Sequence, residues 1–238
     1  MIDELLAETT DSGALRLTLN RPHALNALNG PLKSALLAAI HEVDERTPAV
    51  VLRGAGTAFC AGQDVKTAAD EPTPGLLIQL QEITRALRAC PAPVIAAVHG
   101  HAVGGGAELA LACDLVIADE TAQFQFPETA IGVTVTGGMS SILPSIVGPL
   151  RAKQILFLGD VVSAHDAAAL GMVNRVVAPG ELDAAVAQAL ERLGDRSAPA
   201  IRRAKRLFND SSAAAVAASL EREVDIARSA MRHDLGAR

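Results

Sequence analysis

A continuous apolar run, Pro93 to Val98, leads directly into a glycine-rich turn and then into a second apolar run. The first run, PVIAAV, has no polar position and is bounded by proline and glycine, which is typical of a strand covered on both faces. The turn, HGHAVGGG, places three consecutive glycines and then Glu108 where the second run begins. This segment predicts a strand that enters a helix through a glycine loop, as expected in an α/β fold.

Strand and helix patterns alternate along the rest of the first half of the chain. Leu15, Leu17 and Leu19 alternate with polar residues, as in a half-buried strand, and apolar residues recur at helical spacing behind Pro31. Further strands are predicted at 49–56, 114–119 and 122–126, and a further helix at 77–87. The alternation predicts the α/β fold class.

Helical patterns take over from about residue 137 and are interrupted only by a strand-like segment at 173–177. Ser163, with Asp166 three residues later and Gly171 as a stop signal, predicts a capped helix. Residues 194–238 have the pattern of helices alone.

Composition and charge exclude several classes of protein. The 238 residues are half hydrophobic, which excludes general disorder, and the net charge of -6 argues against a general nucleic-acid binder. No apolar run reaches the roughly 18 residues of a membrane span, and the acidic start lacks the pattern of a secretory signal. Three cysteines without CxxC spacing predict reduced thiols in a cytoplasmic protein, and six scattered histidines predict no metal site.

Glu108 has two explanations that local sequence leaves open. A first-turn carboxylate stabilises a helix through its dipole by about 0.3–1 kcal/mol. Alternatively, the glycines leave backbone N–H groups free for an anionic ligand, on which the carboxylate acts as acid or base. The glycine spacing matches neither the Walker motif nor GxGxxG, and such donors suit an oxyanion as readily as a phosphate.

Four blocks of sequence, taken together and in this order, resemble the crotonase family, also called the enoyl-CoA hydratase/isomerase family. They are RPHALNALN (21–29), AFCAGQDV (58–65), PVIAAVHGHAVGGGAELALACDLVIA (93–118) and AQFQFPETAIG (122–132). The resemblance extends from about Leu15 to the last helices. It implies a spiral of ββα repeats in residues 1–180, a C-terminal helical oligomerisation region in residues 181–238, and homotrimers that often pair into homohexamers.

The resemblance also implies an active site for an acyl-CoA thioester. The backbone N–H groups of Gln63 and Gly105 correspond to the oxyanion hole for the thioester oxygen. The two carboxylates of the family's hydratases correspond to Glu108 and Glu128, which are 20 residues apart as in the family. We expect Glu108 to activate a water held between them and Glu128 to supply the proton at the α-carbon, with the two pKa values separated by their proximity.

A further set of residues corresponds to positions along the substrate and its CoA moiety: Ala24, Ala61, Asp64, Val65, Lys66, Thr136 and Lys205. Lys66 and Lys205 match basic positions that contact CoA phosphates in relatives. Asp64 is also expected to fix its loop through hydrogen bonds to the backbone. Coenzyme A enters as part of the substrate, and no separate cofactor is expected.

One loop departs from the family pattern. Val135 and Thr136 stand where hydratases usually have proline and glycine, and some isomerases have an aspartate at the position of Thr136. A threonine hydroxyl cannot replace that base at pH 7, which weakens a dienoyl-type isomerase. The hydroxyl is expected near the acyl pocket, so the sequence does not predict which acyl group the substrate carries. Gln63 is larger than the alanine common at its position.

The predicted function is hydration of a 2-trans-enoyl-CoA to a 3-hydroxyacyl-CoA through a thioester enolate. The first alternative is an enoyl-CoA double-bond isomerase, which needs only one glutamate to carry the proton. A second alternative, from another class, is a non-catalytic scaffold or RNA-binding member of the family, against which Glu108, Glu128 and the acidic charge argue. The expected partner is acyl-CoA, with no nucleic acid and no membrane.

Overall fold

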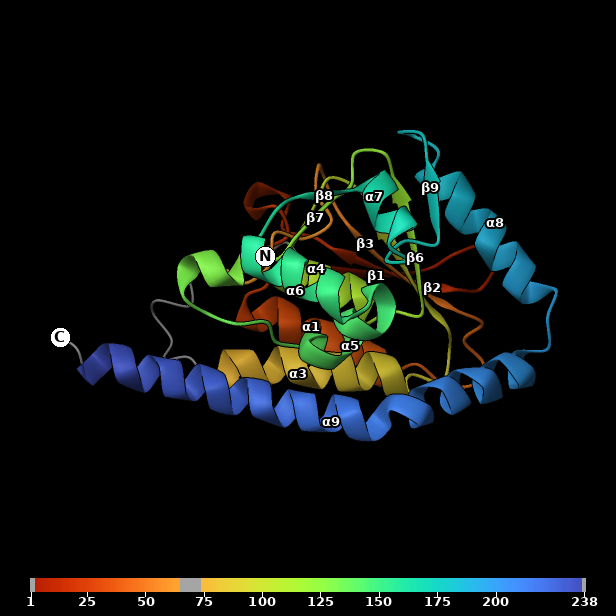
Figure 1. The fold of residues 1–238 in the computed structure, drawn as a ribbon. Coiled ribbons are helices and arrows are strands. Elements are labelled where there is room, and N and C mark those ends of the chain that lie inside the picture. Colours follow the sequence, from red (N-terminus) through yellow and green to blue (C-terminus); the bar gives the residue numbers. More distant parts are fainter. Residues whose placement is uncertain (1–2, 65–73, 237–238) are drawn as a thin grey trace.

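The computed structural model describes residues 3–64 and 74–236, and a six-stranded sheet lies at the centre of this part of the chain (Figure 1). The strands in spatial order are β1 (Leu5–Thr9), β2 (Leu15–Leu19), β3 (Val50–Gly54), β4 (Val94–Val98), β6 (Leu115–Asp119) and β9 (Arg175–Val177). β1 is antiparallel to β2, and the other neighbouring pairs are parallel. Five of these strands confirm predicted ones. β1 was not predicted because four of its five residues are exposed, so no alternation marks it.

A smaller sheet contains β5 (His101–Val103), β7 (Gln123–Gln125) and β8 (Val162–Ser163). β5 is parallel to β7, and Cys60 pairs with Ala102 of β5 as an isolated parallel bridge. The chain therefore passes from the large sheet to the small one after β3, after β4 and after β6. Helix α3 (Pro74–Ala89), α4 (Gly105–Leu111) and the short helix η2 (Glu128–Ile131) follow these three passages. This repetition is the spiral of ββα turns that the family resemblance implied.

The remaining helices surround this spiral: η1 (Pro22–Ala24), α1 (Gly30–His41), α5 (Met139–Val147), α6 (Pro149–Leu158), α7 (Ala164–Ala169), α8 (Leu182–Gly194) and α9 (Ala198–Gly236). The predicted cap of α7 is confirmed, since the Ser163 hydroxyl accepts a hydrogen bond from Asp166 N at 3.1 Å. Among the described residues, no helix combines the length and the apolar character that crossing a membrane requires.

Both faces of the large sheet are covered, as the apolar run in β4 predicted. All five residues of β4 are buried. Ile95 and Ala97 pack with residues of α8, whereas Val94, Ala96 and Val98 belong to the main core, which also includes apolar residues of α1 and α3. The sheet is therefore a middle layer between α8 and the main core.

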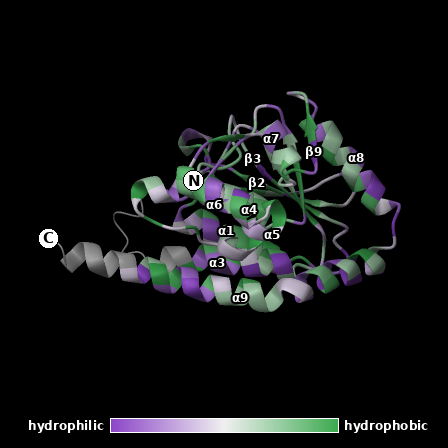
Figure 2. Ribbon diagram, in the orientation of Figure 1, coloured by the Kyte–Doolittle hydropathy of each residue, from purple (hydrophilic) through white to green (hydrophobic). Residues whose placement is uncertain are grey.

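Helix α9 runs along the outer side of α3 and α5 (Figure 1). Hydrophobic and hydrophilic residues are mixed along its length (Figure 2), and Val216 and Leu220 are its buried apolar residues in the main core. α9 is one continuous helix where several were expected. The assignment of residues 181–238 as a separate region stays a prediction.

Candidate active site

The loop before α1 is held in place by Asn26. This residue has a positive φ of 58° and is completely buried. Its side-chain Nδ2 donates hydrogen bonds to the carbonyl oxygens of Ala55 and Ala58, each over 2.8 Å. Leu28 N then donates to Gly62 O at 2.7 Å. The RPHALNALN block thus fixes the position of the loop that carries Gln63.

Two glycine loops meet beside that position. A methyl group at Gly62, whose φ is +86°, would lie 2.5 Å from Val103 O and 3.3 Å from Gly105 N. A methyl group at Gly105 would lie 3.8 Å from Gln63 N. The close approach therefore requires glycine at position 62, and it brings the Gln63 and Gly105 amides together. Among the hydrogen bonds between described residues, neither amide is a donor, as an oxyanion hole would require.

Glu108 lies in the first turn of α4 and is only 1% exposed. Its carboxylate accepts two hydrogen bonds from Thr136: the backbone N–H to Oε1 and the hydroxyl to Oε2, both at 2.7 Å. Burial raises the pKa of Glu108 to about 8, opposed by the two hydrogen bonds from Thr136 and reinforced by the negative charges of Glu128 and Glu223. A helix-dipole residue at the surface would show none of this burial.

Glu128 opens the short helix η2 and is also buried. A methyl group at Gly104 would lie 3.0 Å from Glu128 Oε1, so this carboxylate stands against the glycine turn that precedes α4. Its Oε2 is buried and has no hydrogen-bond partner within the described protein. Burial raises the pKa of Glu128 as well. The structure thus brings two carboxylates of raised pKa to the turn that carries the Gly105 amide.

Burial raises the pKa of both carboxyl groups, and the two hydrogen bonds from Thr136 oppose that rise only at Glu108. The division of acid and base roles between Glu108 and Glu128 stays a prediction.

Comparison with known proteins identifies the family of the chain. The family model for enoyl-CoA hydratase/isomerase matches residues 9–235. The chain belongs to the enoyl-CoA hydratase/isomerase family. A crotonyl-CoA hydratase of Syntrophomonas wolfei is 37% identical over 218 residues, which are 88% of this chain and 83% of the relative. A putative enoyl-CoA hydratase/isomerase of Bacillus subtilis is 37% identical over 215 residues, again 88% and 83% of the two chains.

Solved structures of family members have the same fold. The crystal structure of an enoyl-CoA hydratase from Mycobacterium avium subsp. paratuberculosis matches with a TM-score of 0.89 at 31% identity, over 97% of this chain and 91% of that one. A monofunctional enoyl-CoA isomerase from M. smegmatis matches with a TM-score of 0.76 at 32% identity, over 88% and 93%.

Several other positions matched to the family lie around the glycine loops. Ala24 ends η1, and Ala61 N donates to Leu25 O at 2.9 Å, which joins the first two sequence blocks. Asp64 forms an ion pair with Arg21 at 3.0 Å, and its backbone N–H donates to Leu28 O at 3.1 Å. Its expected side-chain hydrogen bonds to the backbone stay a prediction. Val65 and Lys66 lie outside the described residues.

Lys205 does not suit the role that the family resemblance gave it. Its ammonium group is buried, donates to Leu87 O at 3.0 Å and Ala92 O at 2.9 Å, and pairs with Asp114 at 2.7 Å. An ammonium group has three donors, and these three acceptors occupy them. Lys205 therefore joins α9 to the segment before β4 and is removed from the set expected to contact CoA.

Two buried charged residues at the site were missed by the sequence analysis. Lys33 of α1 is completely buried and its Nζ donates to Gln63 Oε1 at 3.1 Å. Glu223 of α9 is 3% exposed. A signal existed for both, because each lies at helical spacing within an apolar stripe: Lys33 three residues before Leu36, and Glu223 three residues after Leu220.

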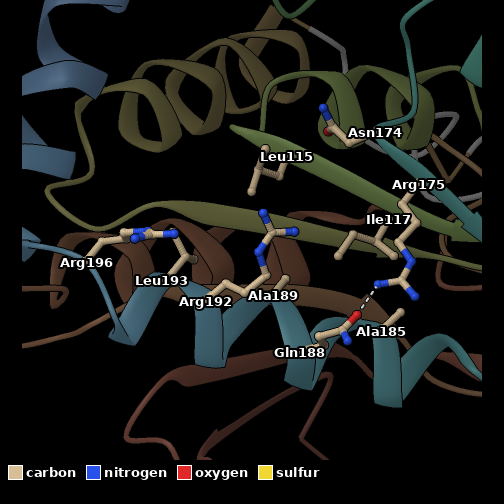
Figure 3. A pocket seen from close by; sticks show the side chains of 10 residues that line it. All are labelled: Leu115, Ile117, Asn174, Arg175, Ala185, Gln188, Ala189, Arg192, Leu193 and Arg196. Atoms are coloured by element: carbon tan, nitrogen blue, oxygen red, sulfur yellow. Dashed lines mark hydrogen bonds between the residues drawn. The ribbon is translucent and has the colours of Figure 1, made fainter.

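A separate groove of about 410 Å³ lies on the other face of the sheet, between α8 and strands β6 and β9 (Figure 3). Arg175, Arg192 and Arg196 line it, and none of the residues that line it is a carboxylate. Such a groove cannot supply the paired acid and base that the family's hydration requires. Within residues 3–64 and 74–236, no cluster of His, Cys, Asp and Glu is arranged to hold a metal ion.

Proposed function

We propose that this protein adds water to a 2-trans-enoyl-CoA and forms a 3-hydroxyacyl-CoA. One observation carries the proposal: two buried carboxylates of raised pKa, Glu108 and Glu128, stand beside the glycine turn where the amides of Gln63 and Gly105 meet. Among the described residues, neither amide has an acceptor. The names of the relatives support the same reaction, since one is a crotonyl-CoA hydratase.

The two N–H groups supply the oxyanion hole. When the oxygen of water bonds to C3 of the enoyl thioester, the electron pair of the double bond moves toward the carbonyl and places negative charge on the thioester oxygen. Gln63 N–H and Gly105 N–H donate to that oxygen in the proposed complex. Losing one such donor typically raises the barrier by about 2.7–4 kcal/mol.

The two carboxylates carry out the two proton transfers of the reaction. Water loses one proton to the carboxylate that acts as base, and the enolate takes one proton at C2 from the carboxyl group that acts as acid. We assign the base to Glu108, because the two hydrogen bonds from Thr136 stabilise its ionised form. A base with a pKa near the operating pH is the most effective in general base catalysis. Glu128, whose Oε2 has no hydrogen-bond partner in residues 3–64 and 74–236, is the donor at C2.

Double-bond isomerisation is the second candidate, and one observation favours it. Thr136 occupies both oxygens of Glu108, whereas Glu128 retains an oxygen with no partner among the described residues. An isomerase moves a proton between two carbons with a single carboxylate, so Glu128 alone is sufficient for that reaction. The structural match to a monofunctional isomerase is compatible with this candidate.

The proposal includes a homotrimer or homohexamer in the cytoplasm, with no cofactor apart from the coenzyme A of the substrate. Large apolar side chains exposed on α6 and α9 support self-association: Leu150, Phe157, Leu158, Leu207 and Phe208. Light scattering of the purified protein measures the mass of the assembly, and a monomer would contradict this part of the proposal.

The test of the reaction is product identification. Crotonyl-CoA and a 3-enoyl-CoA are each incubated with the protein, the ultraviolet absorbance of the conjugated thioester is followed, and the products are weighed by mass spectrometry. Loss of conjugation with a gain of one water supports the hydratase. Conjugation arising from the 3-enoyl-CoA without a change in mass would support the isomerase instead.

A further inference from the structure

Glu223 is a buried carboxylate in the middle of α9. It is 3% exposed and shares the inner face of the helix with Val216 and Leu220. Removing a carboxylate from water is costly unless hydrogen bonds or a countercharge replace the solvent. No ion pair of Glu223 with a cation is found among the described residues, so its stabilisation has another source.

That source is the backbone at the start of α5. Glu223 Oε2 accepts from Gly138 N at 2.8 Å, and Oε1 accepts from Ser140 N at 2.9 Å. The side chain of Gln81 adds a third donor at 3.4 Å. Gly138 is the N-cap of α5 and has no side chain that accepts from this helix. Glu223 therefore caps α5 from a distant part of the sequence, where the helix dipole also favours a negative charge.

The segment capped in this way leads directly to the catalytic pair. Thr136, two residues before Gly138, donates both hydrogen bonds to Glu108. A methyl group at Gly137 would lie 3.3 Å from Glu108 Oε2, and one at Gly138 would lie 3.3 Å from Val216 Cγ1. Residues 136–138 thus lie between Glu108 and α9 and stand close to both.

We propose that Glu223 is a positioning residue for the reaction, through which α9 fixes segment 136–140 and keeps Thr136 hydrogen-bonded to Glu108. The inference rests on the proposed function for its kinetic consequences. Its structural consequence, the coupling of Glu223 to the state of Glu108, holds for any chemistry at this site.

The direction in which the pKa of Glu108 changes distinguishes a positioning role of Glu223 from simple charge repulsion. The charged groups that act on Glu108 are Glu128 from η2 and Glu223 from α9, and Thr136 supplies the opposing hydrogen bonds. Those hydrogen bonds influence the pKa of Glu108 more strongly than the charge of Glu223 does. If the Glu223→Gln change only removed a charge, the pKa of Glu108 would fall. If it also releases Thr136, the pKa of Glu108 rises.

The test compares Glu223→Gln with Glu221→Gln, an exposed position on the same helix. For Glu223→Gln we expect kcat for crotonyl-CoA hydration to fall by about 10-fold or more with KM little changed, as small misplacements at an active site produce. The pH profile of kcat/KM should shift toward higher pH. Glu221→Gln should match the wild type, and Glu223→Asp, which keeps the charge, should recover part of kcat.

Two measurements without substrate keep the inference independent of the assigned reaction. Amide hydrogen exchange in the peptide spanning 134–142 should accelerate in Glu223→Gln while α4 stays protected. The titration of Glu108, followed by carbon NMR of labelled glutamate and assigned with Glu108→Gln, should move upward. A downward or absent shift, or unchanged exchange in this peptide, overturns the proposal. Failure of the wild type to hydrate any enoyl-CoA, with these two results positive, overturns only the assigned function.

Discussion

Thr136 donates both its backbone N–H and its hydroxyl to the carboxylate of Glu108, each over 2.7 Å. The sequence placed this threonine where the family's hydratases have glycine and predicted its hydroxyl near the acyl pocket. In the structure the hydroxyl lies against the carboxylate of Glu108, and its position beside the acyl group stays a prediction. These two hydrogen bonds favour the ionised form of Glu108 and oppose the rise of its pKa.

Replacing Thr136 with valine should raise the pKa of Glu108 further, because a donor to its ionised form is lost. Hydrogen bonds to charged groups contribute roughly 1.5–3 kcal/mol, so kcat/KM near pH 7 should fall by about 10-fold or more. The rising limb of the pH–rate profile should move to higher pH. Thr134→Val, at an exposed position of the same loop, is the matched control. Identical profiles for the two variants would refute the role of the hydroxyl.

Gly104 should be sensitive to alanine because of what its methyl group would meet. The new Cβ would stand 3.0 Å from Glu128 Oε1, and the φ of +51° adds backbone strain. Gly180 has a φ of +87° with nothing within 4 Å, so Gly180→Ala carries the strain alone. Such strain costs about 1–3 kcal/mol and should lower the melting temperature of both variants. Only Gly104→Ala should lose kcat, by about 10-fold or more. Equal kcat in both variants would mean that Glu128 does not depend on this contact.

Glu108 should make stability depend on pH in a defined direction. Its pKa is raised from an ordinary 4.5 to about 8, so the folded chain binds this proton more tightly than the unfolded chain does. Glu108 therefore contributes fully to the free energy of unfolding below its pKa in the unfolded chain, and this contribution is lost as pH rises toward 8. Glu108→Gln removes this pH-dependent loss of stability, which amounts to about 1.4 kcal/mol for each unit of difference between the folded and unfolded pKa. Its melting temperature, compared with the wild type, should therefore gain more at pH 9 than at pH 5. A gain independent of pH would contradict the raised pKa.

Lys205 should matter for stability and not for CoA binding. Lys205→Met removes the ion-pair partner of Asp114 and the ammonium group that donates to Leu87 O and Ala92 O. Lys205 is buried, whereas the side chain of Asp114 is 27% exposed and can be solvated. The main cost is therefore the loss of hydrogen bonds from a buried donor, about 1–3 kcal/mol, which denaturant unfolding measures. The KM for crotonyl-CoA should stay at the wild-type value. Lys153→Met, at an exposed position, controls for loss of a positive charge. A raised KM with unchanged stability would restore Lys205 to the CoA site.

Local periodicity was sufficient for much of the fold. The apolar run of β4 and the alternation in β2 predicted strands because each residue's exposure follows directly from its position in the sheet. β5 has only three residues and β1 is mostly exposed, so neither has a periodic signal. The stacking of ββα turns depends on pairings such as Cys60 with Ala102, which lie far apart in sequence. Only the family resemblance predicted this stacking.

The residues of the site also divide into those that the sequence predicted and those that depend on how distant segments pack. Glu108 and Glu128 stand beside glycine turns that are visible in the sequence, and the family resemblance supplied their roles. Glu223 acts on Gly138, 85 residues earlier, and Lys33 acts on Gln63, 30 residues later. Such contacts are set by how α9 and α1 pack, not by local pattern. Lys205 fails as a CoA ligand for the same reason, since its partners Leu87, Ala92 and Asp114 come from other segments.

The most direct test of the account is the hydration of crotonyl-CoA by Glu108→Gln, Glu128→Gln and the double variant, beside the exposed control Glu120→Gln. Each single change should lower kcat by about 10²–10⁴-fold, as loss of a general acid or base does. The double variant should be little worse than either single one, because the two carboxylates act as a unit. Circular dichroism checks that each variant is folded. Loss of activity in Glu128→Gln alone would contradict the paired mechanism and support the isomerase-type use of one carboxylate, and full activity in both variants would refute the site.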